Sequence, residues 1–273
     1  LDDAAAALAL FDPHSMPASL AAVAALAQAE LAMRSLQIGS ARGALAHAQV
    51  AADSAGVPAL LAEVAEAHAV LQRPAARQLV NGAEQSLRLE EVEALLASDA
   101  LVLDACRRGV GAGAQWQPLA RRPILFTLAH ALARAWPHDV PREDLIAQTF
   151  RTRHPDDTHR ARLRVEVGRL RALIRPMAQI EATARGFILA PRDARAVVVL
   201  APPLDGEQAS LVALLHDGAA WSTSALALAL GTSQRTVQRA LAELEAEGQV
   251  RAIGQARARR WLAPSLSGFT TIL

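Results

Sequence analysis

The sequence predicts a mainly α-helical protein with small β wings, in which an N-terminal array of helical hairpins precedes two helix-turn-helix units. Three observations lead to this fold class. The N-terminal part is rich in alanine at helical spacing, an arginine-rich helix precedes a strand pair in the middle, and a short helix, a glycine and a polar-started helix follow one another near the end. The 273 residues, 52% of them hydrophobic, suffice for roughly two to three packed domains.

Residues 1–97 are expected to form the helical module, with helices over 18–38, 40–55 and 58–71. Their alanine-rich faces let antiparallel helices approach closely, and in texture the module resembles a tetratricopeptide-like solenoid without a clear 34-residue repeat. Such a module would dimerise, hold a small-molecule or peptide effector, mask a basic neighbour in the same chain, or serve only as scaffold. Since the chain starts at Leu1 and not at Met, we expect an N-terminally truncated piece of a longer protein.

The middle segment, residues 98–201, is expected to hold strands and three helices, the last over 158–174. A strand pair around Arg185-Gly186 follows. On a helical wheel of 158–174, one face is apolar and the opposite face carries only small or short residues. Arginines flank that face on both sides and fit the two phosphate walls of a DNA major groove. The predicted contacts are Arg160, Arg162, Arg164, Arg169 and Arg171, with Arg185 at a minor groove or backbone.

Four segments of the middle part resemble the OmpR-type winged helix of response regulators: 119–126, 141–146, 167–173 and 185–189. The resemblance covers roughly residues 98–200 and implies a strand platform, a winged-helix domain and DNA binding. The chain departs from that family in two ways. No phosphoacceptor receiver precedes the domain, and Arg151–Thr158 replaces a tryptophan-bearing loop, so control by phosphorylation does not carry over.

Residues 207–263 are expected to form a second unit of helices and a strand pair, after a linker at Pro202–Gly206. A helix over 224–230, Gly231 and a helix over 233–247 have the order that a helix-turn-helix needs. The segment resembles bacterial winged-helix repressors, which implies a second winged-helix domain. An apolar tail, 264–273, follows. Polar groups for base edges or phosphates come from Ser233, Gln234, Arg235, Thr236, Gln238, Arg239, Arg257 and Arg259.

Charge is segregated along the chain, although the formal net charge is only +1. Residues 1–106 carry a net charge of −8, residues 107–195 carry +9, and residues 196–273 are neutral. A middle third this basic favours a polyanionic partner. All 28 basic residues are arginine, whose forked guanidinium grips phosphate or guanine with two hydrogen bonds.

Other functional classes lack support in the sequence. Cys106 is the single cysteine, which excludes an internal disulfide and a cysteine-rich zinc site; a redox role through Arg107 and Arg108 is the weaker interpretation. His154 and His159 are better explained as a loop and a helix start than as metal ligands. Because phosphate-binding and hydrolase motifs are missing, we expect no enzyme, no cofactor and no metal. With no membrane-length apolar run, the expected location is the cytoplasm, on the nucleoid.

These observations predict a DNA-binding transcriptional regulator with two tandem readers. The expected partners are double-stranded DNA, a second copy of the chain, and an effector at the N-terminal helical module. One alternative is an architectural adaptor in a chromosome or defence complex that binds DNA without sequence preference. The other is an RNA-binding module, which 3% aromatic residues disfavour because few rings can stack on bases.

Overall fold

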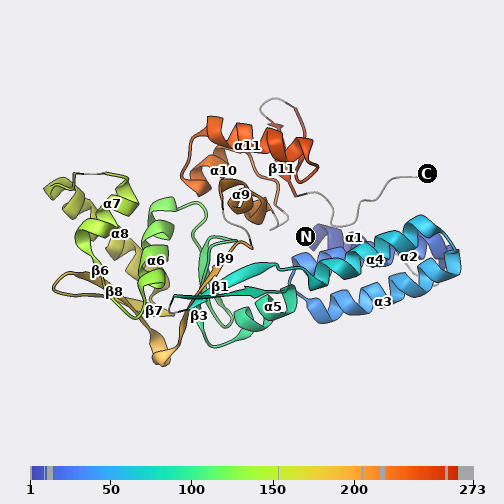
Figure 1. Ribbon diagram of the computed structural model, residues 1–273, viewed down its shortest axis with the longest axis horizontal. Helices are drawn as coiled ribbons and strands as arrows, with labels where there is room; N and C mark the ends of the chain where they lie inside the picture. Colours follow the sequence, from blue (N-terminus) through green and yellow to red (C-terminus); the bar gives the residue numbers. More distant parts are fainter. Residues whose placement is uncertain are drawn as a thin grey trace.

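The computed structural model describes residues 2–8, 10, 15–80, 82–152, 154–203, 206–215, 219–255 and 258–263 (Figure 1). It is an α/β protein with a six-stranded mixed sheet, a three-stranded sheet and a two-stranded sheet. The predicted class, mainly α-helical with small β wings, was therefore wrong. Several short strands far apart in the sequence assemble into one large sheet, which local periodicity does not reveal. The tail 264–273 lies outside the described residues.

The N-terminal helices form an elongated bundle at one end of the molecule (Figure 1). After α1 (Asp2–Leu8), the bundle consists of α2 (Ala18–Arg34), α3 (Ile38–Ala55) and α4 (Pro58–Gln72). Alanine supplies half or more of the buried positions of α2 and α3, so these two helices pack closely along their length. Gly56 in the left-handed conformation ends α3 at φ 63°, where a residue with a side chain would be strained.

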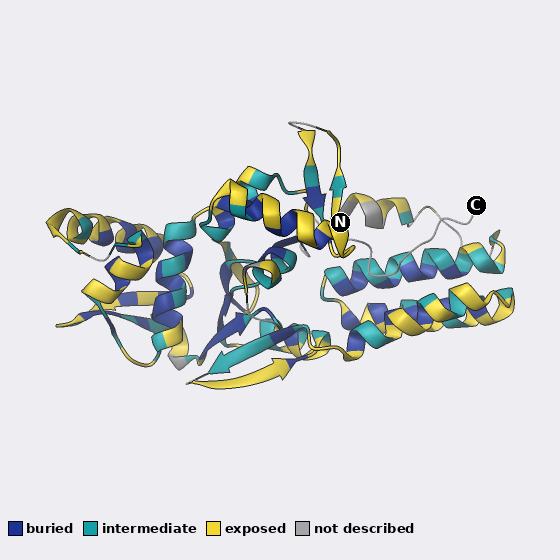
Figure 2. Ribbon diagram, turned by 45° about the horizontal axis from the view of Figure 1, so that its top comes forward, coloured by how far each residue is buried: buried dark blue, intermediate teal, exposed yellow. Residues whose placement is uncertain are grey.

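The six-stranded sheet joins segments from three parts of the chain in the order β2-β1-β9-β3-β4-β5. Its strands are β1 (Ala76–Val80), β2 (Ala83–Leu87), β3 (Leu101–Asp104), β4 (Gly109–Ala112), β5 (Gln115–Pro118) and β9 (Val197–Ala201). Strand β9 pairs parallel with β3 and antiparallel with β1, and β2 is a largely exposed edge (Figure 2). Residues 76–97 were grouped with the helical module, yet the Asn81-Gly82 pair predicts a hairpin between 78–80 and 87–89, and the pairing of β1 with β2 confirms it.

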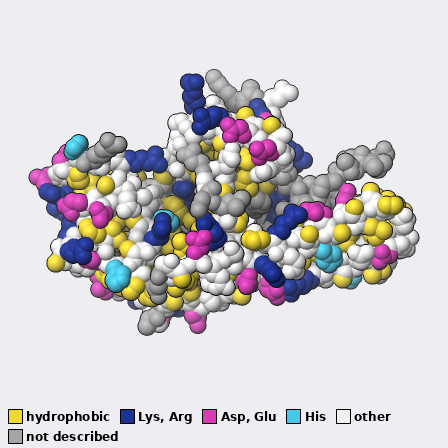
Figure 3. Space-filling view, viewed as in Figure 1, with side chains coloured by type: hydrophobic (Ala, Val, Ile, Leu, Met, Phe, Trp, Pro, Cys, Tyr) yellow, Lys and Arg dark blue, Asp and Glu magenta, His cyan; other side chains and the backbone are white. Residues whose placement is uncertain are grey.

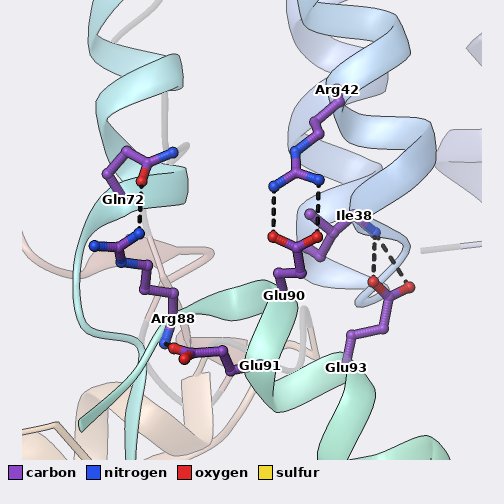
Figure 4. A network of polar contacts seen from close by, with 7 residues as sticks. All are labelled: Ile38, Arg42, Gln72, Arg88, Glu90, Glu91 and Glu93. Atoms are coloured by element: carbon purple, nitrogen blue, oxygen red, sulfur yellow. Dashed lines mark hydrogen bonds and ion pairs between the residues drawn. The ribbon is translucent and has the colours of Figure 1, made fainter.

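Helix α5 (Leu89–Ala97) connects the sheet to the helical bundle through polar contacts (Figure 4). The guanidinium of Arg42 on α3 donates to both carboxylate oxygens of Glu90 at 2.9 and 2.5 Å. The Ile38 amide at the start of α3 donates to Glu93 at 3.3 Å. On the other side of α5, Arg88 donates to Gln72 of α4 at 3.1 Å.

The Arg42–Glu90 ion pair is expected to add little stability despite its good geometry. Both side chains are more than half exposed, so water screens their attraction. We expect Arg42→Ala to leave the free energy of unfolding almost unchanged. Urea unfolding followed by circular dichroism measures this, with Arg73→Ala as a matched exposed control. A loss of stability clearly larger than that of the control would show that the contact is central to the docking of the bundle.

The middle unit packs three helices against the second sheet. After α6 (Pro123–Ala135), β6 (Val140–Pro141) leads into α7 (Arg142–Phe150) and α8 (Asp157–Ile174). The hairpin β7 (Ala178–Ala182) and β8 (Gly186–Pro191) follows, and β8 pairs with β6. At Gly186 the backbones come so close that an added Cβ would lie 1.8 Å from the carbonyl oxygen of Val140, so only glycine fits. One apolar core runs from β3 and β4 through the three helices to β7 and β8.

The C-terminal unit has an apolar core of its own. It consists of α9 (Glu207–Leu215), α10 (Thr223–Leu230), α11 (Gln234–Ala246), β10 (Arg251–Ile253) and β11 (Arg260–Leu262). Trp261 of β11 is 5% exposed, and its indole N–H donates to the Thr223 hydroxyl at 3.1 Å. This bond ties the two-stranded sheet to the start of α10. Among the described residues, no helix is long and apolar enough to cross a membrane.

Candidate nucleic-acid interface

Helix α8 has the two faces that its sequence pattern predicts. Leu163, Val167, Leu170 and Ile174 are each at most 2% exposed and face the core. The opposite face is exposed and carries Ala161, Val165, Gly168 and Ala172. Because these side chains are short, this face leaves room for a second macromolecule to approach the helix backbone.

The arginines of α8 differ in how firmly the protein holds them. Arg160 donates to Asp157 at 3.0 Å, and Arg169 donates to Glu166 at 2.8 Å. The guanidinium of Arg162 lies over the Phe150 ring, 4.5 Å from its centroid. Arg164 is exposed, and no hydrogen bond or ion pair joins it to the part of the chain that the structure describes. Of the predicted phosphate contacts on this helix, Arg164 is the one most available to an outside anion.

Arg171 and Arg185 stand at the hairpin that follows α8. Arg171 donates from Nε to the carbonyl of Ile180 on β7 at 2.6 Å, and its guanidinium lies 5.7 Å from the centre of the Phe187 ring. It therefore fastens the hairpin to α8, a structural role that the wheel did not reveal. Arg185, in the turn of the hairpin, has a side chain that is 71% exposed and lies 3.9 Å from Asp139. It remains accessible from outside.

The segment predicted to be the second helix-turn-helix folds as two helices, α10 and α11, in the C-terminal unit. Gly231, at φ 64°, makes the turn between α10 and α11. The Ser233 hydroxyl caps α11 by accepting the Thr236 amide at 3.1 Å, and the two hydroxyls lie 2.8 Å apart. Gln234, Arg235, Gln238 and Arg239 are exposed on one side of the helix, while Val237, Ala240, Leu241 and Leu244 are buried on the other.

The predicted wing arginines are only partly described. Arg259 donates to both carboxylate oxygens of Glu245 on α11 at 3.0 and 3.1 Å, and its guanidinium lies 4.4 Å from the centre of the Trp261 ring. It is therefore braced against α11. Arg257 lies outside the described residues. On the face seen in Figure 3, basic and acidic side chains are interspersed over the middle and C-terminal units.

Arg108 connects the middle unit to the C-terminal unit, a role that the sequence does not indicate. It lies in the turn after β3, at φ 52°, and its guanidinium is over the Phe126 ring of α6, 4.5 Å from the centroid. Its Nη1 donates to the carbonyl of Ala229 in the last turn of α10, where helix carbonyls lack partners. Burial lowers the pKa of Arg108 to about 10. A side-chain nitrogen of Arg151, the residue that ends α7, lies 3.5 Å from where a Cβ on Gly231 would be.

Arg108 is expected to hold the C-terminal unit against α6. In Arg108→Met the apolar stem still covers Phe126, but the hydrogen bond to α10 is lost. We expect the C-terminal unit to detach more often, so that a protease cleaves the 202–206 linker about 10-fold faster. This factor corresponds to the loss of one hydrogen bond from a charged donor. The exposed Arg122→Met is the matched control. Equal cleavage rates in both variants would show that Arg108 does not fasten the units.

Two sites that the sequence analysis set aside have clear structural roles. Asp156 is the N-cap of α8: it accepts the His159 amide at 2.9 Å and lies 2.5 Å from Nδ1 of the same residue. These hydrogen bonds lower the pKa of Asp156. Burial raises the pKa of the Cys106 thiol, and Asp104 adds to this, so the neighbouring arginines do not make it a reactive thiolate. The weaker redox interpretation of Cys106 loses its physical basis.

No protein-family model matches the chain, and no curated protein matches its sequence. Among solved structures, the chain is similar to the DIP2311 protein of Corynebacterium diphtheriae, with 17% sequence identity and a TM-score of 0.22. The match covers 84% of this chain and 41% of that protein, so the chain spans less than half of its length. A likeness this distant carries no argument about fold or function.

Proposed function

We propose that the chain is a DNA-binding transcriptional regulator that holds duplex DNA with two helix-turn-helix units, α7–α8 and α10–α11. The observation that carries the proposal is the exposed face of α11. Gln234, Arg235, Gln238 and Arg239 lie together at the start of the second helix of the unit, where side chains reach base edges in the major groove.

The middle unit supports the proposal in a different way. The short-residue face of α8 lets its backbone approach a groove, and Arg164 and Arg185 stand at its sides for phosphates. Such contacts supply affinity and position more than sequence information. In this proposal α8 binds the phosphate backbone of the DNA, and α11 contacts the base edges.

The experiment is fluorescence-anisotropy binding to a pool of promoter fragments and to a scrambled duplex, across a salt series. We expect tighter binding to some promoter fragments, with a slope of log affinity against log salt of about −0.9 for each phosphate contacted. Equal, steeply salt-dependent binding to both pools would instead favour the architectural adaptor. Absence of binding by folded protein at low salt would remove DNA as the partner and overturn the proposal.

The same proposal places the protein in the cytoplasm, on the nucleoid. In this proposal the N-terminal helical module binds a second copy of the chain or an effector. Size-exclusion chromatography with light scattering, with and without DNA, measures whether a dimer forms. A monomer in both conditions would exclude dimerisation as the function of the module.

A further inference from the structure

A cavity of about 330 Å³ lies where the helical bundle meets the six-stranded sheet. Its walls come from the corner between α2 and α3, from α5, and from β3, β4 and β5 with the turn after β3. Leu36, Leu96 and Val102 supply apolar surface, and Glu93, Arg107 and Trp116 supply the large polar and aromatic groups. Ligand sites commonly occupy such junctions, with apolar walls and a few fixed polar groups.

Trp116 forms part of the wall of this cavity. Its ring lies across the glycines of β4, so closely that a Cβ at Gly109 would be 2.3 Å from it and one at Gly111 would be 3.0 Å from it. The glycines thus provide the space in which the indole lies against the sheet. Trp116 nevertheless remains 40% exposed, which is unusual for so large an apolar side chain that is already packed on one side.

Arg107 is held in a fixed orientation over the Trp116 ring. Asp104, 1% exposed, accepts the Arg107 backbone amide at 2.8 Å and its Nε at 2.7 Å. The guanidinium carbon lies 4.7 Å from the centre of the Trp116 ring. Within the described residues, the two terminal nitrogens have no hydrogen-bond partner. A buried carboxylate therefore fixes an arginine fork whose other donors remain available.

Glu93 does not compete for this arginine. Its two carboxylate oxygens face the amide of Ile38 at the start of α3, each at 3.3 Å (Figure 4). The cavity thus combines a guanidinium with available donors, the exposed part of an indole and apolar walls. This set of groups suits a planar organic anion, whose ring packs on apolar and aromatic surface and whose carboxylate receives two parallel N–H bonds.

We propose that this cavity is an effector site for a small planar organic carboxylate, with Arg107 binding the carboxylate and the apolar walls, together with the exposed part of Trp116, packing against the ring. The binding site stands independently of the function proposed above, but its role as an effector site rests on it. Arg107 and Arg108 are adjacent, and Arg108 donates to Ala229 of α10. A ligand that shifts Arg107 would therefore act on the turn that holds the C-terminal unit.

The first test uses 2-naphthoate as the probe and its neutral analogue 2-naphthamide as the control ligand, in calorimetric titrations without DNA. We expect saturable binding of the carboxylate that is at least about 10-fold tighter than that of the amide, the range of one charge-assisted contact. The variant Arg107→Gln should lose this preference, and the exposed Arg121→Gln should retain it. No saturable binding of 2-naphthoate at millimolar concentration, or equal binding by both variants, would overturn the proposal.

A second pair of variants protects the test against misfolding, because Arg107→Gln removes the ion pair of the buried Asp104. Ala97→Phe adds bulk at the wall of the cavity, and Ala94→Phe adds the same bulk one turn earlier on α5, outside the cavity lining. Both positions are exposed, so both variants should fold. We expect Ala97→Phe to abolish naphthoate binding and Ala94→Phe to leave it unchanged. Unchanged binding in both would place the ligand elsewhere and overturn the site.

The last experiment distinguishes ligand binding in the cavity from an effect of that ligand on DNA binding. If naphthoate binds in the cavity and changes the salt-corrected DNA affinity of the parent protein but not of Arg108→Met, the effector role is supported. If naphthoate binds but the affinity for DNA stays constant, the cavity is a ligand site and the effector role is overturned. If DNA does not bind at all, the titrations above still decide whether the site exists.

Discussion

Replacing Arg235 and Arg239 together by alanine is expected to weaken the binding of a selected promoter fragment by about 100-fold or more. Both side chains are exposed at the start of α11, and their apolar neighbours Val237 and Leu241 are buried beneath them. An arginine that makes two hydrogen bonds to one base contributes about 1–3 kcal/mol of discrimination against the wrong base. Every 1.4 kcal/mol corresponds to a tenfold change in affinity. The double variant should therefore lose affinity and most of its preference for the promoter over a scrambled duplex.

The measurement is the anisotropy titration on both duplexes at two salt concentrations. Arg73→Ala with Arg88→Ala removes the same charge from the helical bundle and its border with the sheet, and serves as the matched control. Arg164→Ala tests α8 separately: it should weaken binding to both duplexes alike and flatten the salt dependence. If the control and the α11 variant lose affinity equally, the effect is one of net charge, and α11 does not read DNA.

His130 is expected to make the fold less stable in acid, with its effect between about pH 6.5 and pH 4. Burial lowers the pKa of His130 from 6.5 to about 4, and Arg134 and Arg108 repel its proton further. Below pH 6.5 the unfolded chain binds a proton that the folded protein does not bind. The free energy of unfolding therefore falls as the pH falls through this window, by roughly 3 kcal/mol in total, and this loss stops below pH 4.

The variant His130→Gln removes this titration and should keep its stability in that window, apart from the acid response of the carboxylates. Urea unfolding of the parent and the variant at pH 7 and pH 4.5 measures the difference. The exposed His138→Gln is the control and should behave like the parent protein. Parallel loss of stability in all three proteins would show that His130 is accessible to protons in the folded state.

Local pattern was enough to predict the elements that carry the proposed interface. The faces of α8 and α11 follow from the spacing of a few apolar residues, such as Leu163 and Val167, because a helix repeats every 3.6 residues. The hairpin β7–β8 was also predicted, from the Arg185-Gly186 turn. These elements depend on neighbours that are close in the sequence, so the sequence displays them directly.

The six-stranded sheet and the role of individual arginines depend on contacts between distant residues. β9 pairs with β1 across more than one hundred residues, and the strands are too short for their pattern to name a partner. Arg171 and Arg108 look like their neighbours in the sequence, yet each donates to a backbone carbonyl of another element. The cavity beside Trp116 likewise requires the docking of α5 and the α2–α3 corner on the sheet.

The central place of β9 has a consequence for synthesis of the chain on the ribosome. Until residues 197–201 have left the exit tunnel, β1 and β3 lack the strand that separates them in the sheet. During that interval each of them offers an unpaired edge to other nascent chains. The acidic segment before residue 107 stays longest with these unpaired edges, and its negative charge makes copies of the segment repel one another.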